Sequence, residues 1–226
     1  MRSFWPGAPL VLLGYLCGSV SFAYLLGMRW AGVDLRVSGS GKLSASNAYN
    51  YLGAAGMVAV GLLDLLKAAL PVRLALLLHQ PLAVCALVGL AAMAGHNWSL
   101  FLRLRGGRGV GPALGILLNL FVPGVLWMLG HLAAGRLVPP AAPAVGLVGF
   151  LGLPLVAGYL EQPPAMVLAC WGIALLTVLK RLEGSHKALG DRGPWRRVLL
   201  CRLVLDRDIP DFQAWIADGP SGGPAN

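Results

Sequence analysis

Charged residues are scarce in this chain of 226 residues. They make up 12% of the sequence, whereas 57% of it is hydrophobic, and the mean hydropathy is +0.72. So little charge excludes an ordinary soluble domain. The sequence therefore predicts an all-α integral membrane protein. A removable signal peptide is not indicated either, because residues 8–28 are long enough to span a membrane and only Arg2 supplies a basic residue before them.

Paired cysteines and internal repeats are also lacking. Cys17, Cys85, Cys170 and Cys201 stand singly among apolar residues, so we expect reduced core residues and no metal site. An internal repeat is typical of many transporter folds, and its absence disfavours a transporter.

Acidic residues number only 9, against 18 lysines and arginines. In a soluble protein this excess would suggest nucleic acid as a partner. Here the basic residues lie between or after apolar segments, where membrane lipids and phosphate-bearing substrates are the expected partners, and nucleic acid is not. The positive-inside rule places the basic loops in the cytoplasm, with the amino terminus outside and the carboxyl terminus cytoplasmic.

The apolar pattern predicts about seven transmembrane or half-spanning helices in one polytopic domain, residues 1–207, followed by a polar, flexible tail, residues 208–226. The predicted helices cover residues 8–28, 51–70, a run through Pro81 that ends at His96, and residues 111–121, 124–134, 144–160 and 165–179. Pro71 and Arg73 are expected to mark an outer turn. Residues 111–121 and 124–134 are shorter than the ~20 residues of a straight span, which predicts half-helices or a bent hairpin.

Residues 95–112 combine cations with glycines in a loop that suits a phosphate group. Its sequence is GHNWSLFLRLRGGRGVGP, with cations at Arg103, Arg105 and Arg108 and glycines at Gly106, Gly107, Gly109 and Gly111. Glycine lets the backbone approach a bound group, and guanidinium groups bind phosphate. These cations could instead only hold the loop in the cytoplasm. Because the Gly/Ser-rich first loop and the segment around Lys180 are predicted on the same side, we favour the phosphate site.

Asp64 and Lys67 are three residues apart within a predicted membrane helix. Ionisable residues are costly in that environment unless they are paired or functional. An internal ion pair and a substrate role both remain open.

Four sequence blocks resemble those of the bacterial acyl-phosphate:glycerol-3-phosphate acyltransferases. They are LRVSGSGKLSASNAYNYLG at 35–53, DLLK at 64–67, GHNWSLFLRLRGGRGVG at 95–111 and KRLEGSHK at 180–187. The resemblance implies seven membrane helices in the bacterial inner membrane with the active side cytoplasmic. It implies transfer of a fatty acyl group from acyl phosphate to the 1-hydroxyl of glycerol 3-phosphate, which yields lysophosphatidic acid for phospholipid biosynthesis. It implies no cofactor, no metal and neither coenzyme A nor a carrier protein.

The resemblance also suggests roles for individual residues. Ser40, Arg105 and Arg108 are the catalytic candidates. The candidates for binding substrate or phosphate are Arg36, Gly39, Gly41, Asn47, His96, Gly106, Gly107, Gly109, Lys180 and Gly184. For His96, a hydrogen bond to a loop carbonyl is the alternative role.

Several positions depart from the family pattern. Lys42 replaces the usual asparagine and Asn50 the usual arginine, while the third block is eroded at Ala174, Thr177 and His186. Two further functions therefore stay open beside the acyltransferase. One is a catalytically degenerate phosphate-ligand-binding or scaffold protein of the same fold, and the other is a small anion transporter.

Overall fold

The computed structural model describes residues 7–184, 194–211 and 214–215, and these contain helices but no strand. The elements are α1 (Ala8–Ser19), α2 (Phe22–Leu26), a π-helical turn (Gly27–Ala31), α3 (Ala45–Leu77), α4 (Leu82–Asn97), a 3₁₀ turn (Leu100–Leu102), α5 (Val110–Leu120), α6 (Val122–Leu137), a 3₁₀ turn (Pro139–Ala141), α7 (Ala142–Tyr159), α8 (Pro164–Glu183) and α9 (Trp195–Leu205). Among the described residues, five stretches are long and apolar enough to cross a membrane: Ala8–Ala31, Ala45–Leu77, Leu82–Leu102, Pro139–Tyr159 and Pro164–Glu183. The prediction of an all-α membrane protein is confirmed.

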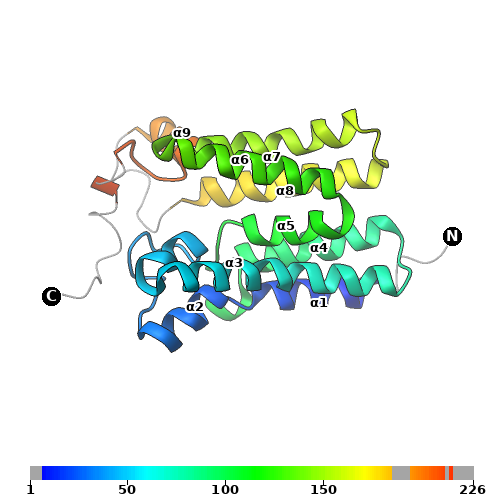
Figure 1. Cartoon of the computed structure of the whole chain (residues 1–226), viewed down its shortest axis with the longest axis horizontal. Coiled ribbons are helices and arrows are strands. Elements are labelled where there is room, and N and C mark those ends of the chain that lie inside the picture. Colours follow the sequence, from blue (N-terminus) through cyan, green and yellow to red (C-terminus); the bar gives the residue numbers. More distant parts are fainter. Residues whose placement is uncertain (1–6, 185–193, 212–213, 216–226) are drawn as a thin grey trace.

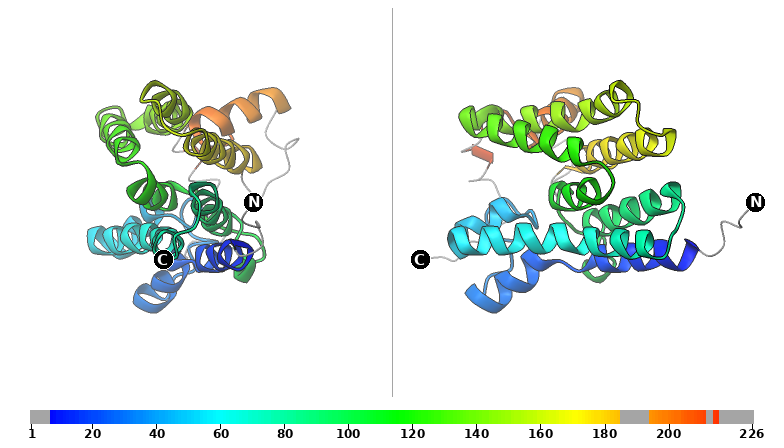
Figure 2. Two further views of the ribbon diagram at one scale, coloured as in Figure 1. Left: turned by 90° about the vertical axis from the view of Figure 1, so that its right-hand side faces the viewer. Right: turned by 45° about the vertical axis from the view of Figure 1, so that its right-hand side comes forward.

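The long helices run side by side along one axis (Figure 1). α1, α3, α4 and α5 pack on one another, and α6, α7 and α8 form a second group. Contacts of α4 with α8 and of α5 with α6 join the two groups. The loop before α3 and the carboxyl-terminal segment lie at the left-hand end of Figure 1, and the loop between α4 and α5 lies further in, in the left half of the bundle. The left view of Figure 2 shows α9 from the side, whereas most other helices are seen nearly end-on. α9 therefore lies across the axis of the bundle.

Apolar side chains fill the inside of the bundle and also cover its outside. Met93, Ile116 and Phe150 are buried at the centre. Leu126 and Leu155 are more than 60% exposed, as expected of side chains that face lipid rather than water. Cys85, Cys170 and Cys201 are buried, Cys17 is partly buried, and all four are free thiols, as predicted.

Small residues bring α1 and α4 into close contact. A Cβ atom added at Gly18 would collide with the carbonyl oxygen of Ala92, and one at Gly95 would collide with that of Tyr15. In lipid, helices associate largely through such close packing. Gly18 and Gly95 therefore serve the packing of α1 against α4.

The first span is broken, although the sequence predicted one helix over residues 8–28. α1 ends at Ser19, Val20 is extended, and Ser21 caps α2 through its side chain. The carbonyl groups freed by the break are bonded: Lys67 Nζ donates to Val20 O over 2.7 Å, and Ser99 donates to Ser19 O. Irregular backbone at membrane depth persists only where such partners satisfy it.

The predicted outer turn at Pro71 and Arg73 is wrong. α3 runs through Pro71 to Leu77, and the chain turns at residues 78–81 instead. Pro71 lies buried in the helix beside Val72, and neighbouring helices allow membrane helices to tolerate the missing N–H donor. The helical stretch is also longer than the predicted residues 51–70: it begins at Ala45, where Ser44 caps it through a bond from Asn47 N, and it is interrupted at Gly53, whose φ of +66° is not helical.

The predicted hairpin corresponds to α5 and α6. Its break falls at Phe121, whose backbone leaves the helical region, rather than at Pro123. Pro123 occupies the first turn of α6, where a missing N–H costs nothing. α6 then runs back beside α7 (Figure 1).

Candidate functional site

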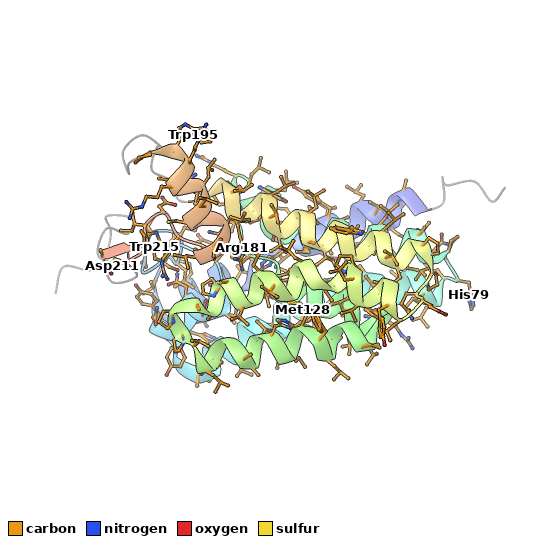
Figure 3. The ribbon with its side chains drawn as sticks, turned by 90° about the horizontal axis from the view of Figure 1, so that it is seen from above. His79, Met128, Arg181, Trp195, Asp211 and Trp215 are labelled. Atoms are coloured by element: carbon orange, nitrogen blue, oxygen red, sulfur yellow. The ribbon has the colours of Figure 1, made fainter. Side chains whose placement is uncertain are left out.

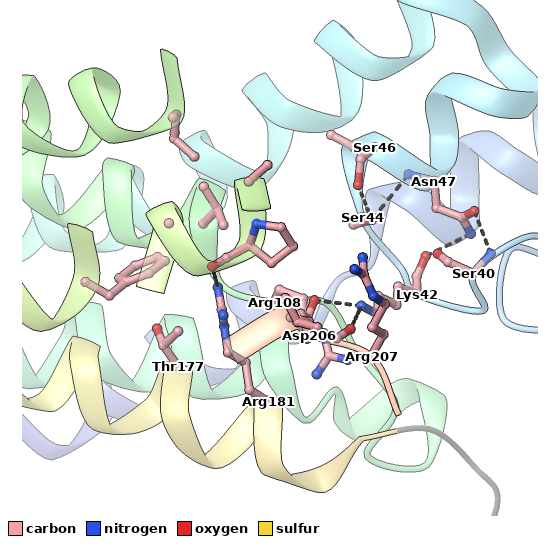
Figure 4. Close-up of a pocket in the computed structure, with 18 of the residues that line it drawn as sticks. Ser40, Lys42, Ser44, Ser46, Asn47, Arg108, Thr177, Arg181, Asp206 and Arg207 are labelled. Atoms are coloured by element: carbon pink, nitrogen blue, oxygen red, sulfur yellow. Dashed lines mark hydrogen bonds and ion pairs between the residues drawn. The ribbon is translucent and has the colours of Figure 1, made fainter. Parts of the chain in front are cut away.

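A cavity of about 550 Å³ lies between the two groups of helices at the end that carries the basic loops. Figure 4 shows the residues of its polar side, which include Ser40, Lys42, Arg108, Arg181 and Asp206. Its apolar side is lined by Val110, Leu132, Pro143, Phe150 and Leu205. The cavity can therefore hold an anionic group at one side and an apolar chain at the other.

The first loop is organised by Asn47. The Asn47 Nδ2 group donates to the carbonyl oxygens of Leu35, Ser38 and Lys42 over 3.0–3.3 Å. Its Oδ1 accepts a bond from Ser40 N over 3.2 Å. Asn47 lines the cavity, but its amide is used to fold the loop, and this holds Ser40 at the cavity wall.

Glycines allow this loop to wrap around the amide. Gly39 has a φ of +57°, and a Cβ atom there would lie 2.5 Å from Asn47 Oδ1. Gly39 does not line the cavity. We therefore interpret its contribution as shaping the loop that presents Ser40.

The second loop packs on the end of α4. Gly107 N donates to His96 O over 3.0 Å, and a Cβ atom at Gly106 or Gly107 would collide with His96. Gly107 and Gly109 do not line the cavity. These glycines serve close packing of the backbone, and the loop turns Arg108 towards the cavity as a result.

Arg108 and Lys42 both bind Asp206. Arg108 Nε lies 3.0 Å from Asp206 Oδ1, and Lys42 Nζ lies 2.6 Å from Asp206 Oδ2. Lys42 Nζ also donates to the Asp206 carbonyl oxygen, and Arg108 Nη1 donates to the Lys180 carbonyl oxygen. Figure 4 shows the interactions of Asp206 with Arg108 and Lys42 on the cavity wall.

The burial of this cluster changes its titration. Burial lowers the pKa of Lys42 to about 8, although Asp206 acts in the opposite direction. Burial tends to raise the pKa of Asp206, but Arg108 and Lys42 outweigh it and hold the pKa below its usual range. Asp206 is therefore a carboxylate at neutral pH.

A smaller recess adjoins the cavity and collects other predicted site residues. It is lined by Arg36, Gly41, Leu43, Arg105, Gly106, Lys180, Glu183 and Gly184 together with Lys42 and Arg108, which line the larger cavity as well. Arg36 donates to both carboxylate oxygens of Asp34 over 2.6–3.0 Å, and these bonds lower the pKa of Asp34. Lys180 Nζ lies 2.9 Å from Glu183 Oε2. Arg108 is the sequence-predicted cation that faces both spaces.

His96, Asp64 and Lys67 form a separate buried cluster. Lys67 Nζ lies 2.9 Å from Asp64 Oδ1, and His96 Nδ1 lies 3.6 Å from the same oxygen. None of the three lines the cavity or the recess. Because Lys67 also bonds to Val20 O, this cluster holds the broken first span against α3 and α4.

The third sequence block contributes Arg181 to the cavity, in addition to the predicted Lys180 and Gly184, which line the recess. Thr177 lines the cavity, but its hydroxyl donates to Ile173 O within its own helix over 2.9 Å. Arg181, one turn further along α8, lines the cavity and donates to Pro143 O over 2.8 Å. A Cβ atom at Gly184, which has a φ of +68°, would collide with Arg202. His186 lies outside the described residues.

The sequence interpretation missed Lys42, Arg181, Asp206 and Arg207 as lining residues. Lys42 was noted only as a departure from the family pattern, although it directly follows Ser40 and Gly41. Arg181 adjoins Lys180 and could have been found by helical spacing from Thr177. Asp206 and Arg207 belong to no motif. Within the part of the chain that the structure describes, no group of three or more His, Cys, Asp or Glu side chains could hold a metal ion.

Comparisons with known proteins agree with the geometry. A profile of the family described as glycerol-3-phosphate acyltransferase matches residues 8–189. Glycerol-3-phosphate acyltransferase 5 of Dehalococcoides mccartyi is 34% identical over 213 residues, which cover 92% of this chain and 91% of the relative. The glycerol-3-phosphate acyltransferase of Myxococcus xanthus is 46% identical over 145 residues, covering 63% of this chain and 71% of the relative.

A solved structure also shares the fold. The glycerol 3-phosphate form of PlsY, described as an integral membrane glycerol 3-phosphate acyltransferase, aligns with a TM-score of 0.72 and 27% identity. The alignment covers 79% of this chain and 89% of that chain. The resemblance predicted from the sequence blocks is confirmed, and the chain belongs to the glycerol-3-phosphate acyltransferase family.

Proposed function

We propose that this protein transfers a fatty acyl group from acyl phosphate to the 1-hydroxyl of glycerol 3-phosphate. One observation carries the proposal: the cavity has a cationic side at Lys42, Arg108 and Arg181 and an apolar side at Leu132 and Phe150. An acyl phosphate has the same two chemical parts. The names of the relatives, which are glycerol-3-phosphate acyltransferases, support the acceptor.

The reaction exchanges one acyl–oxygen bond for another. The 1-hydroxyl oxygen of glycerol 3-phosphate attacks the acyl carbon, the bond from that carbon to the phosphate oxygen breaks, and the hydroxyl proton leaves with the phosphate. The products are lysophosphatidic acid and inorganic phosphate. An acyl phosphate is already activated, so the enzyme has chiefly to orient two phosphate-bearing molecules and to stabilise the departing phosphate.

The two adjoining spaces suggest how the residues divide this work. The larger cavity takes the acyl phosphate, with its chain against the apolar side. The recess beside it takes the phosphate of the acceptor, where Arg105 is a cation of the wall and the phosphate would share Arg36 with Asp34 and Lys180 with Glu183. Arg108 lines both spaces and stabilises the departing phosphate, while Ser40 at the loop tip donates a hydrogen bond.

The basic loops also indicate the membrane orientation. The first loop, the loop between α4 and α5 and the carboxyl-terminal segment lie towards one end of the bundle (Figure 1). The positive-inside rule assigns that end to the cytoplasm of a bacterial inner membrane. This is also the side on which glycerol 3-phosphate, a soluble metabolite, would enter.

Purified protein with palmitoyl phosphate and labelled glycerol 3-phosphate tests the activity directly. We expect labelled lysophosphatidic acid and an equal amount of inorganic phosphate, with no product when palmitoyl-coenzyme A replaces the acyl phosphate. The proposal would fail if neither glycerol 3-phosphate nor dihydroxyacetone phosphate nor another polyol phosphate accepted the acyl group.

A degenerate binding protein of the same fold is the second candidate. It is favoured by the Thr177 hydroxyl, which bonds to Ile173 O instead of facing a ligand, and by Ala174, which offers no donor. This candidate predicts that glycerol 3-phosphate binds without turnover. Growth of an acyltransferase-deficient strain rescued by this gene would exclude it.

A further inference from the structure

The carboxyl-terminal segment forms part of the cavity although it lies beyond the region that defines the family. The family profile ends at residue 189, whereas Leu205, Asp206, Arg207 and Trp215 line the cavity. Figure 3 shows Trp215 and Asp211 at the same end of the bundle as Arg181, opposite His79. The segment therefore forms one wall of the cavity, and the Gly/Ser loop and the arginine–glycine loop form another.

Asp206 connects this wall to both family loops. Its two carboxylate oxygens lie 2.6 Å from Lys42 Nζ and 3.0 Å from Arg108 Nε. Lys42 comes from the Gly/Ser loop and Arg108 from the arginine–glycine loop. The Trp215 ring lies over Lys42, with Nζ 4.8 Å from the ring centroid. One carboxylate thus ties together two cations that are distant in sequence.

The segment is fixed firmly enough to hold Asp206 in place. Asp206 follows α9 in the left-handed region, and its N–H donates to Arg202 O over 3.1 Å. Arg202 pairs with Asp208 over 2.8 Å, and both side chains are at least 95% buried. Arg181 donates to Leu203 O over 2.9 Å. α9 is therefore anchored to α8 next to the cavity.

Asp206 could either orient Lys42 and Arg108 or block the cavity, and the geometry favours the first role. The cavity retains about 550 Å³ with Asp206 in the wall. Arg108 Nε is paired with Asp206 Oδ1 by charge and not by a hydrogen bond, and Nη1 donates to the Lys180 carbonyl, so the N–H groups of Nη2 remain as donors. Lysine and arginine side chains lose rotamer entropy when they bind a ligand, and holding them beforehand reduces that cost.

We propose that Asp206 is a positioning residue that holds Lys42 and Arg108 in the orientation in which they bind substrate phosphate. This inference rests on the proposed function, because it assigns the phosphate of glycerol 3-phosphate or acyl phosphate to these two cations. The carboxyl-terminal segment is then part of the binding site and not an appendage.

Asp206→Asn in the full-length protein tests the inference, with Asp206→Glu as the conservative variant. Titration calorimetry with glycerol 3-phosphate gives Kd without turnover, and KM and kcat follow from assays with palmitoyl phosphate. We expect Asp206→Asn to raise Kd and KM for glycerol 3-phosphate by about tenfold, the usual effect of losing one charge-assisted contact, and Asp206→Glu to recover most of the affinity. Asp211→Asn is the matched control, because Asp211 is exposed and does not line the cavity.

The pH dependence separates positioning from a merely structural role. Asp206 raises the pKa of Lys42, while Arg108 and Arg181 lower it. KM for glycerol 3-phosphate should rise at alkaline pH as Lys42 loses its proton. Removal of the Asp206 charge should move this rise to lower pH, and Asp206→Glu should return it to the wild-type pH. A segment that was only loosened would lower the melting temperature without this shift.

Three results would overturn the inference. Tighter binding by Asp206→Asn would show that the carboxylate competes with phosphate. Wild-type affinity in Asp206→Asn would show that the cations need no carboxylate. Equal losses in the Asn and Glu variants with an unmoved alkaline limb would show a structural role only. If the wild-type protein binds glycerol 3-phosphate but makes no lysophosphatidic acid, the proposed function fails, and the Kd comparison still decides the role of Asp206.

Discussion

At the level of single residues, Arg108 and Arg103 lie in the same loop but in different surroundings. Arg108 lines both the cavity and the recess, whereas Arg103 is exposed and lines neither. We expect Arg108→Ala to lower kcat/KM for glycerol 3-phosphate by about tenfold to a hundredfold, because a charge-assisted contact to phosphate contributes about 1.5–3 kcal/mol. Arg103→Ala removes the same charge from the same loop and should change kcat/KM less than about threefold.

The comparison of these two variants also tests the simpler explanation of the loop. If its arginines only set the membrane orientation or attract anions to the surface, both substitutions should weaken catalysis equally. Higher salt should then also abolish most of the effect, because exposed charges are screened within about 8–10 Å. A contact inside the cavity is screened less.

Lys42 predicts a loss of substrate affinity at alkaline pH. Burial lowers its pKa to about 8, so the ammonium group loses its charge as the pH rises through that value. Glycerol 3-phosphate has already lost its second phosphate proton near pH ~6. KM for glycerol 3-phosphate, measured between about pH 7 and pH 9, should therefore rise by about tenfold as the cation disappears. Lys42→Arg should remove this rise, since arginine stays charged.

The stability of the protein should change with pH in the opposite direction. The ordinary pKa of lysine is 10.5, and the folded value of Lys42 is lower. Between about 8 and 10.5 the unfolded chain binds more protons at this residue, so its contribution to stability increases as the pH rises. A fall in affinity together with an unchanged or higher melting temperature would therefore reflect Lys42. A KM that stays flat for wild type would contradict the assignment.

Only part of the site could be predicted residue by residue. Ser40 and Arg108 stand in glycine-rich motifs, and both line the cavity. Gly107 and His96 stand in the same motifs but serve packing, because a glycine that admits a phosphate and one that admits a neighbouring backbone look alike in sequence. Asp206 was missed because its bond to Lys42 joins residues 164 positions apart, and neither residue's local pattern indicates the other.

At the level of helices, the break in the first span depends on Lys67. Its ammonium group bonds to Val20 O and pairs with Asp64 in a buried environment. Lys67→Met should destabilise the protein strongly, by about 3–5 kcal/mol on the scale of broken buried pairs, because it leaves the Asp64 carboxylate with His96 alone and the Val20 carbonyl without its side-chain donor. Thermal unfolding in detergent measures this as a lower melting temperature.

A double variant shows whether the stability comes from the Asp64–Lys67 ion pair or from the packing of the Lys67 side chain. Asp64→Leu with Lys67→Met removes both charges and should recover part of the lost melting temperature, since replacing a whole buried pair costs less than breaking it. If the single and double variants melted at the same reduced temperature, the packing of the lysine stem and not the charge pairing would be responsible. A single variant as stable as wild type would show that the break needs no lysine.

Helix boundaries were predicted less well than helix existence, for physical reasons. Hydropathy located the apolar segments, but Pro71 lies inside α3 and Val20 interrupts the first span. Proline in a membrane helix can be accommodated by neighbours, and a break can be stabilised by side chains from other helices. Both outcomes depend on tertiary contacts such as Lys67 with Val20.

At the level of the whole molecule, the distribution of charge was predictable and the closure of the site was not. The sequence predicted that the basic loops meet on one side of the membrane, and the structure brings Lys42 and Arg108 to one cavity there. The charge pattern could not indicate that the segment after α8 folds back onto that cavity. That arrangement depends on buried contacts of α9, such as Arg202 with Asp208.

The same end-to-end arrangement predicts the orientation of the protein in the membrane. Arg103 and Glu161 are both exposed and have similar φ angles of +53° and +50°. Arg103 belongs to the connection between α4 and α5 and Glu161 to the turn between α7 and α8, and these two connections lie on opposite halves of the bundle along its axis (Figure 1). In a cysteine-free background, Arg103→Cys and Glu161→Cys therefore form a matched pair of labelling sites. The positive-inside rule predicts that a membrane-impermeant maleimide added to intact cells whose outer membrane is permeabilised labels Glu161→Cys only.

Lysis should then expose Arg103→Cys to the same reagent. Labelling of Arg103→Cys before lysis, with Glu161→Cys protected, would mean that the cavity opens to the outside, and the proposed supply of glycerol 3-phosphate from the cytoplasm would be wrong. Equal labelling of both sites in intact cells would indicate a mixed orientation. Because the two sites share exposure and backbone conformation, a difference in their labelling reports the side of the membrane rather than the reactivity of the thiol.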